Sequence, residues 1–140
     1  MNSFFYASAS GWIASILIGA EIVLPYLLRR TRLSELLGIA SRDGRPYLQR
    51  MRPHYWAGYV LIVLSTAHAW VPMQTGHMGR ANMTGLWFAT AALLLLLFQA
   101  ALGLALQDAK LPDRARFRSW HYWTMMALML CVAAHVWLNA

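Results

Sequence analysis

Four of the five histidines in the chain belong to a repeated pattern that could bind a metal centre. Residues 54–56 read His-Tyr-Trp, and residues 67–70 read Ala-His-Ala-Trp. The same two patterns return as His-Tyr-Trp at 121–123 and Ala-His-Val-Trp at 134–137. The interval between the two histidines is 14 residues in both copies. Imidazole is a good iron ligand, and a histidine inside a membrane is costly unless it has such a role.

The 14-residue interval has a direct geometric meaning on an α-helix. It amounts to nearly four turns, so the two histidines differ by only about 40° in direction and stand about 21 Å apart. On two parallel helices, His54 then lies level with His121, and His68 lies level with His135. A planar macrocycle at each level could take one imidazole from each side. The pattern therefore predicts two bis-histidine b-type haems, stacked along the helix axes.

The elements that must position these histidines are apolar helices. The chain has 140 residues, 59% of them hydrophobic and 12% charged, whereas soluble domains carry about 25% charged residues. A bilayer core needs roughly 20 mostly apolar residues per helix, and four segments qualify: 8–28, 54–72, 84–106 and 119–138. We therefore expect an all-α membrane protein, a single up-down four-helix transmembrane bundle over residues 1–140.

The basic residues indicate how this bundle is oriented. Seven arginines lie around the loop after the first segment, and one lysine and three arginines lie around the loop after the third. The loop after the second segment carries Arg80 alone. The positive-inside rule places the two basic loops in the cytoplasm and both termini on the outer, periplasmic side of the plasma (inner) membrane. These loops also account for the net charge of +7, so we expect lipid rather than nucleic acid as the partner.

Several glycines are candidates to make room for the macrocycles. Gly11 and Gly19 lie on the first predicted span, and Gly85 and Gly103 lie on the third. Gly58 follows His54 by one turn. The alternative for each is ordinary close packing, because glycine is common where membrane helices meet.

Polar residues near the ends of the spans are candidates to bind the haem propionates, which need cationic or hydrogen-bonding partners. Arg52 and Arg118 lie closest to the cytoplasmic ligands, and the alternative for each is contact with lipid headgroups. The other candidates are Arg50 and Arg116 at the same end, and Gln74, His77, Arg80 and Asn82 at the outer end.

Glu21 stands out because it lies eight positions before Arg29, about 12 Å deeper along the helix. A carboxylate at that depth indicates a function. It could carry protons for quinone chemistry near the inner haem, or it could be a structural anchor bonded to another span.

The paired histidines resemble the haem-binding half of cytochrome b from quinol-oxidising bc-type complexes and, more distantly, ferric reductase-like membrane domains. The resemblance implies His54 with His121 and His68 with His135 as axial pairs. It also implies electron transfer as the cytochrome b subunit of a larger respiratory or redox complex. The partners that it implies are other redox subunits and, as a further candidate, a quinone. The sequence lacks a second helical half, a flavin domain and a Pro-Glu-Trp-Tyr motif.

Other functions remain as alternatives. A self-contained quinol-oxidising enzyme or transmembrane reductase is supported by Glu21 alone, so enzymatic activity is left open. A metal transporter predicts carboxylates beside the histidines, and the second and fourth spans contain none. A haem-free membrane anchor gives no reason for the repeated interval. The single cysteine, Cys131, excludes an intramolecular disulfide, a cysteine-bound iron–sulfur cluster and c-type haem attachment.

Overall fold

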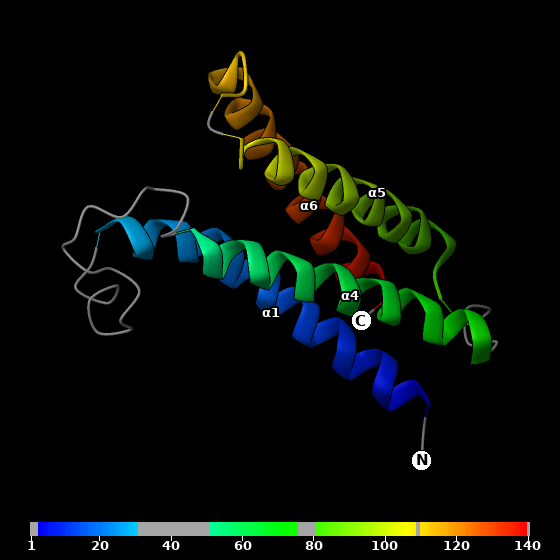
Figure 1. Ribbon diagram of the computed structural model, residues 1–140. Coiled ribbons are helices and arrows are strands. Elements are labelled where there is room, and N and C mark those ends of the chain that lie inside the picture. Colours follow the sequence, from blue (N-terminus) through cyan, green and yellow to red (C-terminus); the bar gives the residue numbers. More distant parts are fainter. Residues whose placement is uncertain (1–2, 31–50, 76–80, 109, 140) are drawn as a thin grey trace.

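The structure, a computed structural model, describes residues 3–30, 51–75, 81–108 and 110–139. This part of the chain forms four α-helices and contains no strand (Figure 1). They are α1 (Ser3–Arg30), α4 (Arg52–Thr75), α5 (Met83–Ala105) and α6 (Arg114–Asn139). The expectation of an all-α protein is thus confirmed. Arg50, His77 and Arg80 lie outside the described residues.

Three of the helices are long and apolar enough to cross a membrane. These are α4, over Arg52–Gln74, and the whole of α5 and α6. In α1, the described apolar stretch is shorter and covers Ala9–Val23. The second, third and fourth predicted spans therefore correspond to helices of sufficient length, while the first corresponds to a helix with a shorter described apolar stretch.

Local sequence explains where α5 begins and ends. The side chain of Asn82 caps its first turn, with Oδ1 accepting hydrogen bonds from two backbone N–H groups, as N-cap residues commonly do. At the other end, the Arg114 guanidinium donates to the carbonyl oxygens of Leu106 and Asp108 at 2.6 and 2.5 Å. These bonds satisfy carbonyls that the end of a helix leaves without partners. Arg114 thereby ties the start of α6 to the end of α5.

The helices pack as two hairpins. α1 packs along α4, and α5 packs most extensively along α6, whereas contact between the hairpins is smaller and runs mainly from α4 to α5. Successive helices run in opposite directions, so the start of α1 and the end of α6 lie at the same end of the molecule (Figure 1). The described helices therefore have the up-down order expected from the sequence.

One buried layer joins all four helices. Leu61 of α4 and Leu128 of α6 are its most buried members, at 2% and 1% exposure. Each lies midway between the two histidines of its helix, seven residues from either one. Seven residues are almost two turns, so the leucine shares a face with both histidines. The layer consequently lies between the two levels of histidines; its other members are Ala14, Ile18, Ala92 and Leu96.

The outer surface of the described helices is strongly apolar. All seven tryptophans are exposed, together with many leucine, isoleucine and valine side chains. Large exposed apolar areas are unusual on soluble proteins and are expected where lipid is the solvent. Glu21 and Gln99 are the buried polar side chains of the described part.

Candidate functional site

The structure brings the four patterned histidines together in two pairs. In the first pair, His54 of α4 and His121 of α6 have ring centroids 6.3 Å apart and an interplanar angle of 83°. In the second pair, His68 of α4 and His135 of α6 have ring centroids 6.4 Å apart and an interplanar angle of 76°. Both pairs therefore have nearly the same geometry, and each joins one hairpin to the other.

The ring separation matches what two imidazoles on one metal require. A metal–imidazole bond is about 2.0–2.1 Å, and a ring nitrogen lies about 1.1 Å from its ring centroid, so two ligands on opposite sides of one metal have centroids about 6.3 Å apart. Rings in direct contact also lie about 4.5–7 Å apart. The distance fits both two rings bound to one metal and two rings in direct contact. The residues around the rings must therefore distinguish between these arrangements.

In the second pair, hydrogen bonding orients the rings. His135 Nδ1 lies 3.0 Å from the carbonyl oxygen of Gly85. A carbonyl can only accept, so in this contact Nδ1 donates, and a neutral ring with that tautomer keeps the Nε2 lone pair for a metal; the Asn139 amide nitrogen lies farther from Nδ1, at 3.4 Å. His68 Nδ1 lies 3.1 Å from the hydroxyl of Ser10. Such partners on Nδ1 are typical of metal-binding histidines, because they fix the tautomer and the ring orientation.

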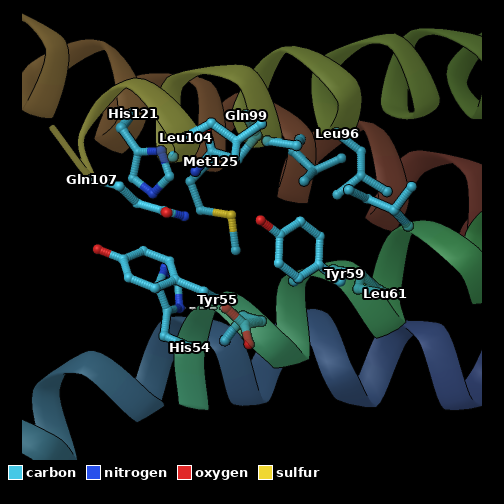
Figure 2. Close-up of a pocket in the computed structure, with 16 residues that line it drawn as sticks. His54, Tyr55, Tyr59, Leu61, Leu96, Gln99, Leu104, Gln107, His121 and Met125 are labelled. Carbon is cyan, nitrogen blue, oxygen red and sulfur yellow. Dashed lines mark ion pairs between the residues drawn. The ribbon is translucent and has the colours of Figure 1, made fainter. Parts of the chain in front are cut away.

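In the first pair, a carboxylate takes this role. Glu21 Oε2 forms an ion-pair contact with His54 Nδ1, drawn as a dashed line in Figure 2. Glu21 is buried, with 5% exposure. Among the described residues, Glu21 Oε1, His54 Nδ1 and His121 Nδ1 are buried atoms without a hydrogen-bond partner, so the Glu21–His54 contact is an ion-pair contact. Two roles were considered for Glu21, a proton carrier and an anchor to another span. The structure shows a contact with another helix, and its partner is His54, one of the patterned histidines.

A pocket opens between the rings of the first pair. His54 and His121 point into it from opposite walls (Figure 2). Its empty space, counting the part open to the outside, is about 590 Å³. The remaining lining is largely apolar, with three polar side chains, Glu21, Gln99 and Gln107. The other lining residues are Tyr55, Gly58, Tyr59, Leu61, Ile62, Leu96, Ala100, Gly103, Leu104, Met125 and Leu128.

Three of the five candidate glycines lie against a paired histidine, whereas Gly58 has no atom within 4 Å of an added Cβ. A Cβ added at Gly11 would come within 2.9 Å of His68 Cε1, and one at Gly103 would lie 3.7 Å from His121 Cε1. Gly85 contributes its carbonyl to His135, and a Cβ there would overlap Asn139. Gly19 is exposed, with no atom within 4 Å of its added Cβ.

The arginine candidates lie at the surface. Arg52 and Arg118 are both exposed, and no described contact joins them to a histidine. Arg116 stacks over the ring of Trp120, with the guanidinium carbon 4.7 Å from the centroid. Asn82, a candidate for the other end, serves as the N-cap of α5.

Two residues of the site escaped the sequence reasoning. Ser10 carries no distinguishing signal, because serine is common in membrane helices. Gln99 could have been found, since it is the one polar side chain in the apolar run 91–102 and intramembrane polar groups indicate function. It is buried in the pocket wall, where its Oε1 accepts a hydrogen bond from the Thr124 hydroxyl.

The donor set of each pair suits a macrocyclic metal centre. Within the described residues, no group of three or more His, Cys, Asp or Glu side chains could hold a bare metal ion. Each pair offers two imidazoles, which is the number that a haem iron takes from the protein in bis-histidine ligation.

Comparisons of the chain with protein-family models, with curated proteins and with solved structures find no match in any of the three.

Proposed function

We propose that this chain is a di-haem membrane cytochrome b that carries electrons across a bilayer. The observation that carries the proposal is the repetition of one geometry. Two histidine pairs, each joining α4 to α6, have ring separations of 6.3 and 6.4 Å. A chance contact between two histidines has no reason to recur after 14 residues on both helices.

The chain's own residues would hold and separate two haems. His54 with His121, and His68 with His135, would supply the imidazole ligands. Glu21, Ser10 and the Gly85 carbonyl orient the rings through Nδ1. When bound, haem supplies a reversible one-electron iron couple.

The buried leucine layer gives each pair an apolar environment on the side that faces the other pair. Leu61 and Leu128 lie between the two levels and exclude water from the middle of the bundle. A low dielectric around the iron is one of the means by which a protein sets a haem potential.

In this proposal, the chain has four spans in the plasma membrane. Both termini lie on the outer side, and the arginine-rich loops lie on the cytoplasmic side. Three helices are long and apolar enough to span it. We assign the chain to a larger redox complex, as the cytochrome b subunit that exchanges electrons with other subunits or with a quinone.

The deciding experiment measures haem on the purified protein. A reduced-minus-oxidised spectrum with haem quantification should give about two b-type haems per chain. The H68A variant should retain about one, because only the second pair loses a ligand. L130A is the control, since Leu130 lies on α6 at a 71% exposed position, and it should retain two. Absence of haem from wild-type protein produced with ample haem, or two haems in H68A, would overturn the proposal.

A further inference from the structure

The two histidine pairs have similar ring geometry but differ in chemistry behind the rings. In the second pair, both Nδ1 atoms face uncharged oxygens, the Ser10 hydroxyl and the Gly85 carbonyl. In the first pair, His54 Nδ1 faces the buried carboxylate of Glu21. The pairs are therefore electronically unequal.

We propose that Glu21 is the positioning residue for His54 and makes the haem at the first pair the one with the lower reduction potential. This inference rests on the proposed di-haem function. Glu21 lies on α1 and His54 on α4, and the contact holds the His54 ring with Nδ1 toward Glu21 and Nε2 available to a metal.

Two effects of the carboxylate act in the same direction. A carboxylate in ion-pair contact with Nδ1 makes the imidazole a stronger donor to a metal, which favours the more highly charged ferric state. Ferric iron carries one positive charge more than ferrous iron, so a nearby negative charge also stabilises the ferric state, and does so strongly in a buried site. Both effects lower the potential.

The environment of Glu21 strengthens this effect. Its exposure is 5%, and within the described residues its ion-pair partner is His54 and not an arginine or a lysine, while Oε1 has no hydrogen-bond partner. Among the residues that the structure describes, no salt bridge to an arginine reduces its influence on His54, and its burial limits screening by solvent.

The ordering of the two potentials implies a direction. Electrons move spontaneously toward the higher potential, so they pass from the level of His54 and His121 to the level of His68 and His135. In the proposed orientation, this is from the cytoplasmic side of the membrane to the outer side, which places the electron donor at the cytoplasmic face.

The test is a spectroelectrochemical titration of the haem-loaded protein and of two variants. E21Q keeps the size of the side chain and an acceptor oxygen but removes the charge. We expect one of the two couples, the lower one, to shift about tenfold toward the reduced state, about 59 mV for one electron. The other couple should stay unchanged. S10A is the matched control behind His68, and it should leave the lower couple unchanged.

The outcomes separate this inference from the proposed function. Two bound haems with both potentials unchanged in E21Q, or a shift of the higher couple alone, would overturn the role of Glu21 and leave the di-haem function standing. Wild-type protein without haem would overturn both. If E21Q does not assemble, the same titration is made in E21D, which keeps the charge but moves it away from His54. In E21D, a rise in the lower of the two reduction potentials supports the inference, and two unchanged potentials refute it.

Discussion

Substitution of Gly11 by alanine tests whether the close approach of α1 to the second histidine pair matters. The added Cβ would lie 2.9 Å from His68 Cε1, 3.4 Å from Nδ1 and 3.5 Å from Nε2. Carbon atoms normally approach to about 3.5–4.0 Å, so the His68 ring must move by roughly 0.6 Å or α1 must withdraw. Either change disturbs the position of His68 relative to His135.

The expected magnitude follows from the cost of overpacking. An extra methyl group in a filled site costs about 1–3 kcal/mol, which corresponds to about 5- to 150-fold weaker binding of the proposed haem at the second pair. The first pair should be unaffected, because the three atoms nearest to the added Cβ all belong to His68. At limiting haem supply, G11A should therefore contain closer to one haem per chain than two.

The chain supplies a matched control on the same helix. Gly19 is exposed and has no atom within 4 Å of its added Cβ, so G19A should bind haem as wild type does and gain up to about 1 kcal/mol of helix stability. The assay is haem content per chain, measured over a series of haem concentrations. Equal haem binding by G11A and G19A would refute the packing argument at Gly11.

The remaining predictions concern the packing of the bundle. L128A should lower the free energy of unfolding by about 2–5 kcal/mol, because Leu128 is 1% exposed. L130A, at a 71% exposed position, should change it little. Equal thermal stability of the two variants would contradict the role of Leu128 in the buried layer. N82A should cost about 0.5–2 kcal/mol through loss of the α5 cap, and N82S should restore most of it; thermal unfolding followed by circular dichroism measures both.

The level at which each histidine lies could be predicted from the sequence. The interval of 14 residues fixes both the height and the direction of the second histidine relative to the first on any regular helix. Pairing across helices then requires only that α4 and α6 run parallel. The up-down order supplied that condition. The pairing of His54 with His121 and of His68 with His135 accordingly follows from local geometry and topology, and the structure has both pairs.

The partners behind the rings could not be predicted in this way. They depend on how α1 and α5 are rotated about their axes, and the hydrophobic pattern leaves that rotation open because these helices are apolar nearly all round. Gly11 and Gly19 illustrate the problem. They looked equivalent as small residues on one helix, yet one lies against His68 and the other is exposed. Likewise, the depth of Glu21 was evident, whereas its contact with His54 was not.

The division into two hairpins has a consequence for how the protein is made. In the proposed four-span arrangement, each hairpin would enter the bilayer as its own unit, because α1 packs with α4 and α5 packs with α6. Each proposed haem takes one ligand from either hairpin, so cofactor insertion would join the two halves. Binding that is available only to the assembled state adds to its stability. Cellular haem supply would then govern how much of this protein survives quality control, independently of how much is synthesised.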